Sequence, residues 1–288
     1  MTHRQLTWLV TGASAGLGRA IAEAALTAGD RVLAAVRTPE RVADLAARHP
    51  DHLAVVAHDV RDVAHAPDVV RTAIDRFDSL DVVVNNAGRG LIGAAEEVTD
   101  AELRELMDLH LFGPVALVRA ALPHLRARRS GTVIQVSSQG GRLSFPGVST
   151  YSATKFALEG WSEALAGEVA GFGVRVLIVE PSAFRTSFNA DGVLDFVAES
   201  PVYQDMLAPV RAGMRAAHGR QEGDPARAAE ILVGLAHAAE VPLRLALGQE
   251  ALDRIGDSYR RGLVELERWA DVAASADFAD TEPASRPS

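Results

Sequence analysis

A tyrosine and a lysine four residues apart are the residues of this chain best suited to chemistry. All but one of its 29 basic residues are arginine, and the only lysine, Lys155, follows Tyr151 by one helical turn. Residues at this spacing share a helix face, so the ammonium can lie beside the phenol and lower its pKa. Lysine, unlike arginine, can also pass a proton onward. The pair predicts a general acid/base with a proton relay behind it, the alternative being a surface helix pair.

A glycine-rich turn near the N-terminus is suited to a phosphate group. The apolar segment 6–10 is followed by the sequence TGASAGLG at 11–18 and then by a segment of helical periodicity. Glycines let the backbone turn tightly and approach a pyrophosphate, whose charge a helix N-terminus favours. The alternative is that these glycines form a tight turn that binds no ligand. The residues predicted to bind a dinucleotide here are Gly12, Ser14, Gly16, Leu17 and Gly18.

The residue after the second predicted strand bears on the choice of cofactor. Enzymes that bind the ribose 2′-hydroxyl of NAD(H) place an acid there, whereas this chain has Arg37. The planar fork of a guanidinium can pair with a 2′-phosphate, so we expect NADP(H) rather than NAD(H), unless Arg37 is a solvated loop residue. Asp59 and Val60 follow the third strand and are predicted to contact the adenine, although Asp59 could equally cap the next helix.

Two further motifs follow predicted strands. Residues 85–88, with the sequence NNAG, combine small residues with amide side chains, which suits a loop pressed against a cofactor but alone would indicate only a turn. Ser138 follows the fifth strand and precedes Tyr151 across a Gly/Pro-rich loop. Its hydroxyl could bond a substrate oxygen beside the phenol, or it could cap a loop.

An alternation of strands and helices positions these motifs. Short β-branched runs alternate with Ala-rich segments of helical period, which is typical of strand–helix units around a parallel sheet. We predict an α/β fold, a doubly wound parallel sheet of about seven strands with helices on both faces and ligands at its carboxyl edge. The predicted strands lie near 6–10, 31–36, 53–57, 81–85, 132–137, 174–179 and 243–247, and the helices near 17–28, 40–48, 62–77, 100–127, 151–170, 226–238 and 249–268.

Length and composition limit the remaining possibilities. With 288 residues and no apparent linker, the chain is expected to form one catalytic domain over 1–272. Residues 186–224 break the alternation and are interpreted as a substrate-covering insertion, and 273–288 as a flexible tail. The absence of cysteine excludes disulfides and thiolate metal sites, and we predict no metal. The net charge of −9 argues against nucleic acid, and the lack of a long apolar run or leader predicts a cytoplasmic protein without membrane insertion.

Together, the ordered motifs resemble those of the short-chain dehydrogenase/reductase family over about residues 5–250. The resemblance implies a single-domain Rossmann fold and reversible hydride transfer between a nicotinamide and an alcohol or carbonyl. It implies that Ser138 orients the substrate, that Tyr151 is the acid/base, and that Lys155 bonds the ribose and depresses the tyrosine pKa. The other cofactor contacts it implies are Gly12, Gly16 and Gly18 at the pyrophosphate, Asn86, Ala87 and Gly88 in the supporting loop, and Pro181 and Thr186 at the carboxamide.

Two positions depart from the family pattern. The family's relay asparagine aligns with His110. Imidazole can hold a water or accept a proton, so the relay can persist in altered form; equally, His110 can be a packed residue with the relay rerouted through other water. Ser182 stands where the family usually has glycine and is expected to narrow the nicotinamide loop without blocking it.

The predicted function is reduction of an apolar ketone or aldehyde, or the reverse oxidation, with Ser138, Tyr151, Lys155 and His110 as the catalytic set. A non-catalytic NADP(H)-binding regulatory protein is the alternative, and a sugar-nucleotide epimerase is a third possibility. The resemblance also implies a homodimer or homotetramer, paired through the helices near 100–127 and 151–170. The side chains expected at the substrate are mostly apolar: Leu91, Ile92, Phe145, Val148, Phe188, Phe196, Tyr203 and Met206.

Overall fold

Seven parallel strands form the central sheet of this chain. The computed structural model describes residues 4–190, 192–198 and 200–278. The strand order is β3-β2-β1-β4-β6-β7-β9, which reverses direction between β1 and β4 and so creates a switch point there. The α/β fold predicted from the sequence is confirmed. The strands are β1 (Thr7–Thr11), β2 (Arg31–Val36), β3 (Leu53–Ala57), β4 (Val82–Asn85), β6 (Gly131–Val136), β7 (Val174–Pro181) and β9 (Arg244–Leu247).

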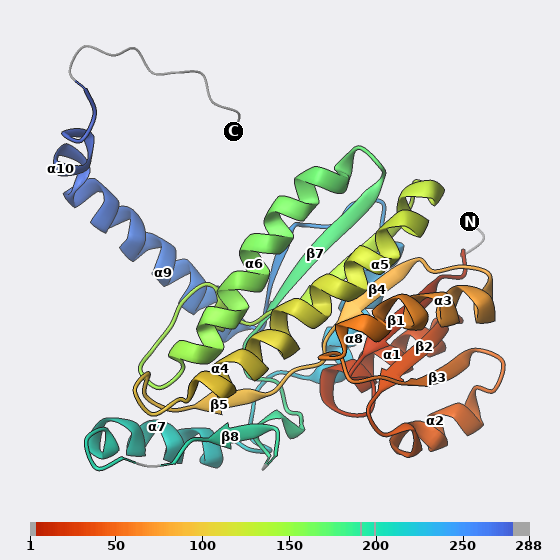
Figure 1. The fold of residues 1–288 in the computed structure, drawn as a ribbon, viewed down its shortest axis with the longest axis horizontal. Helices are drawn as coiled ribbons and strands as arrows, with labels where there is room; N and C mark the ends of the chain where they lie inside the picture. The colour runs from red at the N-terminus through yellow and green to blue at the C-terminus, as the bar shows by residue number, and fades with distance from the viewer. Residues whose placement is uncertain (1–3, 191, 199, 279–288) are drawn as a thin grey trace.

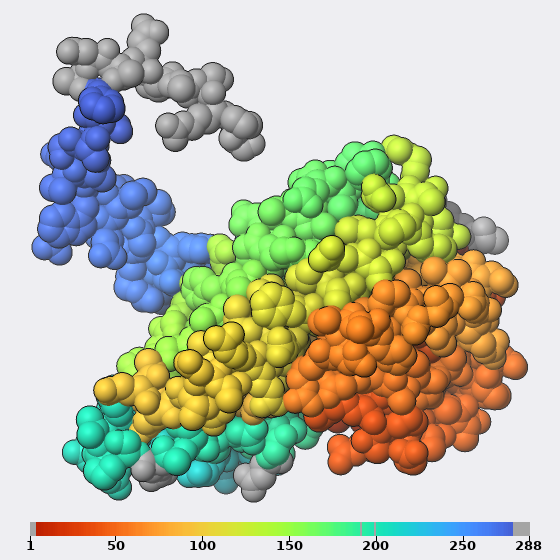
Figure 2. All heavy atoms as spheres, in the orientation of Figure 1, coloured from red at the N-terminus to blue at the C-terminus, as the bar shows by residue number. Residues whose placement is uncertain are grey.

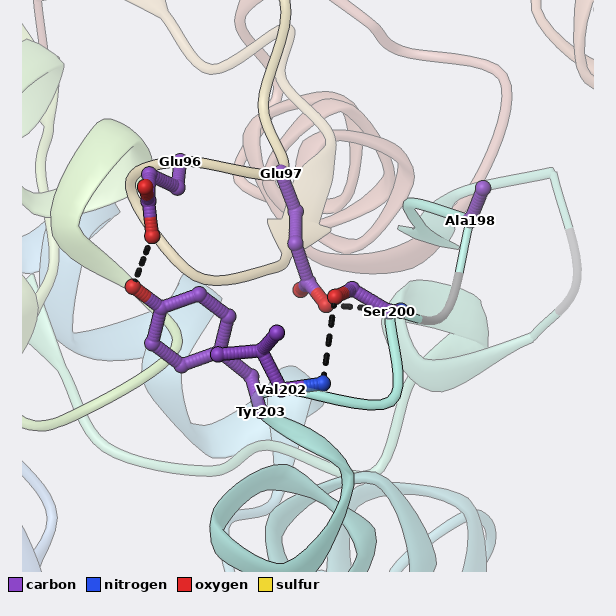
Figure 3. A pocket seen from close by; sticks show the side chains of 6 residues that line it. All are labelled: Glu96, Glu97, Ala198, Ser200, Val202 and Tyr203. Atoms are coloured by element: carbon purple, nitrogen blue, oxygen red, sulfur yellow. Dashed lines mark hydrogen bonds between the residues drawn. The ribbon is translucent and has the colours of Figure 1, made fainter.

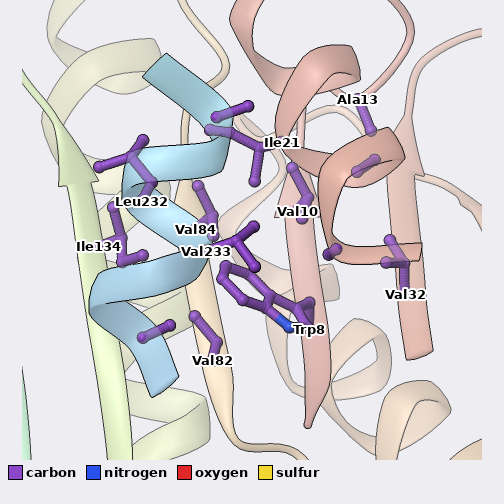
Figure 4. Close-up of a cluster of buried hydrophobic side chains, with 14 of the residues drawn as sticks. Trp8, Val10, Ala13, Ile21, Val32, Val82, Val84, Ile134, Leu232 and Val233 are labelled. Atoms are coloured by element: carbon purple, nitrogen blue, oxygen red, sulfur yellow. The ribbon is translucent and has the colours of Figure 1, made fainter. Parts of the chain in front are cut away.

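Helices cover both faces of the sheet because successive strand residues point to opposite sides. Trp8 and Val10 of β1 pack with α1 and α8 on one face (Figure 4), whereas Leu9 packs with α3, α5 and α6 on the other. All three side chains are fully buried, and each contributes roughly 1.5–3 kcal/mol of transfer free energy. The helices of these layers are α1 (Gly16–Thr27), α3 (Ala66–Phe77), α5 (Gly113–Arg128), α6 (Ser149–Ala170) and α8 (Pro225–His237), and the short α2 (Ala43–Arg48) precedes β3 (Figure 1).

The helix predicted over 100–127 is interrupted. It consists of α4 (Asp100–Met107), a π-helical turn at Asp108–Phe112, and α5. Pro114 lacks an N–H, so it cannot close the α-helical hydrogen bond to the carbonyl four residues earlier. Gly113 also lies against the backbone that follows β3, since a Cβ there would be 2.3 Å from the carbonyl oxygen of Val60. The resulting turn carries His110, which is buried.

The segment 186–224 contains elements that the sequence pattern did not reveal. It carries a 3₁₀ turn (Ser187–Asn189), β8 (Leu194–Phe196) and α7 (Gln204–Ala216). Strand β8 pairs in parallel with β5 (Gly90–Ile92), so the segment is fastened to the chain that follows the NNAG motif. Figure 1 shows β5, β8 and α7 together at one end of the molecule. That this segment covers the substrate stays a prediction.

The C-terminal helices extend away from the rest of the described chain (Figures 1 and 2). Helix α9 (Gln249–Arg268) buries only Ala251 and Ile255, in its first two turns, and α10 (Ala270–Ala274) buries nothing. Of the predicted tail at 273–288, residues 279–288 lie outside the described residues.

One helical stretch, Asp100–Arg128, is long and apolar enough to cross a membrane by length and composition. Its residues Leu117, Val118 and Leu125 are fully buried in the cluster beneath the sheet. Core packing therefore accounts for its apolar character, and the absence of membrane insertion stays a prediction.

Candidate active site

The glycine-rich turn adopts a backbone that side chains would obstruct. Gly12 and Gly16 have φ values of 67° and 56°, in the region that favours glycine. A Cβ on Gly18 would lie 2.3 Å from Asn86 Nδ2 and 2.6 Å from the carbonyl oxygen of Gly12. The turn thus keeps its backbone open beside the N-terminus of α1, while the side chain of Leu17 packs against the core. Ser14 is partly exposed in the same turn.

Thr11 and Asn86 bind this turn to the NNAG motif across the switch point. Thr11 Oγ1 accepts hydrogen bonds from the backbone N–H groups of Asn86 at 2.9 Å and Ala87 at 3.1 Å. Asn86 Nδ2 donates to the carbonyl oxygen of Thr11 at 3.0 Å. The structure therefore brings the two predicted cofactor motifs into direct contact.

Arg37 and Asp59 lie at the carboxyl ends of β2 and β3, on the side of the switch point where the adenine half is expected. Arg37 is exposed, and its charge contributes to lowering the pKa of Asp59. The main cause is Arg61, which donates to both carboxylate oxygens of Asp59 and brings its pKa to about 2. Asp59 does not cap the following helix; Asp62 caps the 3₁₀ turn before α3 instead. Val60 is buried beside α5.

Ser138, Tyr151 and Lys155 converge at the carboxyl edge of β6. The hydroxyl of Ser138 accepts a hydrogen bond from the N–H of Gly140 at 3.0 Å, so this serine caps a short turn and also hydrogen-bonds the phenol. A Cβ on Gly140 would lie 3.2 Å from the Tyr151 ring and 3.4 Å from Ser138 Oγ, so glycine allows the two side chains to meet. Lys155 Nζ lies 5.8 Å from the centre of the Tyr151 ring and donates to the carbonyl oxygen of Val136 at 3.0 Å.

The protonation states differ from the expectation for the Tyr–Lys pair. Burial raises the pKa of Tyr151, and the hydrogen bond from Ser138 offsets this only in part. Burial also lowers the pKa of Lys155 to about 8, against the opposing charge of Glu159. The lowering of the Tyr151 pKa by Lys155 that the sequence predicts is not found in this structure, where desolvation is the largest influence on that pKa. Tyr151 is a protonated phenol, poised as an acid.

His110 is held by both of its ring nitrogens. Nδ1 lies 2.8 Å from Thr154 Oγ1, whose own proton goes to the carbonyl oxygen of Tyr151, so we assign the ring proton to Nδ1. Nε2 accepts from the N–H of Arg89 at 3.2 Å. Burial and the nearby charges of Lys155 and Arg89 lower the pKa of His110 well below its usual value. The geometry favours the packed, neutral histidine over a proton relay.

The loop after β7 completes the cofactor side of the site. A Cβ on Gly16 would lie 3.4 Å from that of Thr186, so the loop lies beside the glycine turn. Pro181 ends β7 opposite Leu247 of β9. The Ser182 hydroxyl lies against Gly248, where a Cβ would be 2.3 Å away, so glycine at 248 accommodates the serine that departs from the family pattern.

Apolar side chains surround Tyr151 on the other side. Its ring meets Phe188 edge-on at 6.4 Å and His110 at 5.6 Å. Two small buried clusters that include Leu91 and Ile92 also pack against it. Six of the eight predicted substrate-lining residues lie in this wall: Leu91, Ile92, Phe145, Val148, Phe188 and Phe196.

Tyr203 and Met206 do not belong to this wall. Tyr203 bonds Glu96 through its hydroxyl and lines a separate hollow of about 400 Å³ with Glu97 and Ser200 (Figure 3). Met206 is exposed on α7. Sequence reasoning also missed Thr154, which connects His110 to the catalytic helix, and Glu159, whose position one turn after Lys155 could have revealed it.

These residues fit a dinucleotide. The cradle at Gly12, Gly16 and Gly18 leaves room that a Cβ would fill, and it faces the N-terminus of a helix. A doubly wound sheet with such a turn at its switch point and a Ser–Tyr–Lys set beside it defines a nucleotide-binding Rossmann-fold oxidoreductase.

Comparisons identify the family. Residues 7–194 match the sequence profile of the short-chain dehydrogenase family. The chain is 34% identical over 270 residues to the oxidoreductase BOA17 of Botryotinia fuckeliana, covering 93% of this chain and 98% of the relative. It is 34% identical over 198 residues to a 3-ketodihydrosphingosine reductase of Bacteroides thetaiotaomicron, covering 68% and 71% of the two chains. The crystal structure of a short-chain dehydrogenase from Streptomyces avermitilis superimposes with a TM-score of 0.90 at 46% identity, covering 96% of this chain and 100% of that one. The chain belongs to the short-chain dehydrogenase/reductase family and is an oxidoreductase of the NAD(P)-using kind.

Proposed function

We propose that this protein is an NADP(H)-dependent oxidoreductase that interconverts an apolar ketone or aldehyde and its alcohol. The observation that carries the proposal is the convergence of Ser138, Tyr151 and Lys155 beside the glycine-rich turn. In the reducing direction, Ser138 holds the carbonyl oxygen and Tyr151 gives it a proton. Lys155 then returns a proton toward Tyr151. The nicotinamide, when bound, supplies the hydride.

The protonation states support this direction. Tyr151 is partly buried, and its phenol, with a pKa raised by desolvation, remains protonated at neutral pH and can act as an acid. Lys155, with a pKa of about 8, is charged at neutral pH yet can release its proton at small cost. Alcohol oxidation needs the phenolate and is expected to require higher pH.

The choice of NADP(H) rests on the end of β2. Val36 is followed by the exposed Arg37, and no acid occupies this position. A guanidinium can pair with the 2′-phosphate in a bidentate manner. Asp59 faces the same region with its carboxylate held by Arg61, and we propose that Asp59 and Val60 contact the adenine.

The substrate class rests on the apolar wall around Tyr151. Burial of Leu91, Ile92 and Val148 beside the phenol favours a hydrophobic carbonyl compound. One relative is named as a reductase of a keto compound, the 3-ketodihydrosphingosine reductase of Bacteroides thetaiotaomicron, which supports a carbonyl substrate.

We propose a homodimer or homotetramer in which the exposed sides of α5 and α6 pair. Phe112, the last residue of the π-helical turn before α5, and Phe156 of α6 are each about half exposed, at 50% and 47%. A cytoplasmic location stays a prediction.

The test is a screen of NADPH and NADH oxidation with apolar ketones and aldehydes. We expect turnover with NADPH and at least one apolar carbonyl compound. NADPH binding without turnover across a broad panel would instead favour the non-catalytic regulatory protein.

A further inference from the structure

Two acidic side chains lie buried behind the catalytic lysine, outside the residues that the proposed mechanism uses. Glu159 of α6 and Glu180 of β7 are each only 2% exposed. Two arginines face both of them. Arg244 Nε lies 3.1 Å from Glu159 Oε2 and 3.6 Å from Glu180 Oε1, and Arg142 Nε lies 3.6 Å from Glu180 Oε1. We call Glu159 and Glu180 the carboxyl pair.

The two carboxyl groups share one guanidinium, because Arg244 Nε faces an oxygen of each. Glu159 Oε1 and Glu180 Oε1 have no donor at full hydrogen-bonding geometry within the described ranges. Burial, followed by the charge of Glu159 and a hydrogen bond to it, raises the pKa of Glu180 to about 7. Two carboxyl groups can hydrogen-bond each other only if one of them carries a proton. A single proton between the two carboxyl groups would satisfy these two unpaired oxygens, in line with the raised pKa of Glu180.

The pair is placed to act on the active site. Glu159 follows Lys155 by one turn of α6, and its charge opposes the desolvation that lowers the pKa of Lys155. A Cβ on Gly141 would lie 2.6 Å from Ser137 Oγ and 3.2 Å from Glu159 Oε1, so the pair is pressed against the turn that follows Ser138. His110 stands at the family's relay position, but both of its ring nitrogens are already engaged in hydrogen bonds. The carboxyl pair, and not His110, is therefore the group placed to act on Lys155.

We propose that Glu159 and Glu180 share a single proton and that the charge of this pair holds Lys155 in its protonated form through the neutral pH range. Both are positioning residues for the relay, and the inference rests on the proposed function of Lys155. As pH rises and the pair loses its shared proton, its negative charge grows and Lys155 retains its own proton more firmly.

The other groups that face the carboxyl pair do not provide a charge that changes with pH beside Lys155. Arg142 and Arg244 stay charged at all relevant pH values, and the Ser137 hydroxyl is neutral. Glu163 bonds Arg244 at 2.9 Å but is exposed on the outer side of α6, with a side chain 59% accessible. Glu163 is therefore the matched control.

Because Lys155 is the only lysine, its titration can be followed directly. Labelling the full chain with isotopically enriched lysine gives one side-chain NMR signal, whose pH dependence reports the pKa of Lys155. We expect Glu159→Gln to lower this pKa by about one pH unit, because the nearest negative charge is lost. Glu180→Gln should leave it unchanged or raise it, because Glu159 then keeps its full charge. Glu163→Gln should leave it unchanged.

A lower Lys155 pKa in Glu159→Gln but not in Glu180→Gln distinguishes electrostatic control from a structural role. Equal decreases in both variants, or no change in Glu159→Gln, would overturn the proposal. The wild-type chain gives a second measurement that needs no variant to fold. An infrared carbonyl band of a protonated carboxyl group should be present at mildly acidic pH and disappear in alkaline solution, and its absence would also overturn the proposal.

Neither measurement requires cofactor or substrate. A failure to find any carbonyl turnover would count against the proposed function, whereas the NMR titration would still decide the inference about the pair. If turnover is found, the alkaline limit of kcat should move down in pH in Glu159→Gln and not in Glu163→Gln.

Discussion

Gly18→Ala tests whether the glycine-rich turn is built as the structure shows. Gly18 lies in the first turn of α1, where alanine would gain about 1 kcal/mol of helix propensity. Its Cβ would, however, lie 2.6 Å from the carbonyl oxygen of Gly12 and 2.3 Å from Asn86 Nδ2. Overpacking of this kind costs about 1–3 kcal/mol. Displacing Asn86 also breaks its bond to Thr11, which costs about 1 kcal/mol more. The net expectation is a loss of roughly 1–3 kcal/mol.

Two assays check this expectation. Thermal unfolding should show a Tm lowered by roughly 2–12 °C. NADPH fluorescence titration should show affinity reduced by about tenfold or more, since a displaced turn no longer fits the pyrophosphate. Gly234→Ala in α8 is the control, because its Cβ would meet nothing within 4 Å and should leave both quantities intact or raise Tm. A Gly18→Ala variant as stable as wild type, with unchanged NADPH affinity, would refute the reasoning.

Three further predictions concern the cofactor and the relay. Arg37→Glu should raise KM for NADPH by about tenfold or more and change KM for NADH little, since it removes the partner of the 2′-phosphate; equal effects on both cofactors would contradict that role. Lys155→Arg keeps the positive charge but removes the transferable proton. We therefore expect kcat for carbonyl reduction to fall by about 100-fold while NADPH still binds. A variant with wild-type kcat would count against the relay. Burial lowers the pKa of Lys155 to about 8, so the rate of carbonyl reduction should be constant below that pH and should decline as pH rises through it. A pH–rate profile that stays flat well above pH 8 would exclude Lys155 as the limiting group.

The sequence predicted the central sheet well because the strands between its two edges, β2, β1, β4, β6 and β7, are buried on both faces along most of their length. Such strands form short, mostly apolar runs, and each predicted strand lies within two residues of the observed one. Strands β5 and β8 were missed because each has only three residues, too few to show a period. The break at 108–112 has a local signal in Pro114, but the apolar pattern runs through it and conceals the π-helical turn.

The sequence was enough to predict that the motifs at the strand ends lie close together, because the carboxyl ends of parallel strands lie along one edge of the sheet. What could not be read was how deeply each group is buried and where its polar atoms point. Burial raises the pKa of Tyr151, and Lys155 Nζ donates to the Val136 carbonyl; spacing alone reveals neither. Glu159 and Glu180 meet at Arg244 from a helix and a strand through tertiary packing, which likewise has no sequence signature.

Proton donation by Tyr151 is the centre of this account, and Tyr151→Phe tests it most directly. The measurement is single-turnover NADPH oxidation with an apolar ketone that the wild-type protein reduces. We predict that the phenylalanine variant binds NADPH within about threefold of wild type and loses about 100-fold to 10,000-fold in rate, because only the proton-donating hydroxyl is removed. A variant that oxidises NADPH within about tenfold of the wild-type rate would contradict the assignment of Tyr151 as the catalytic acid.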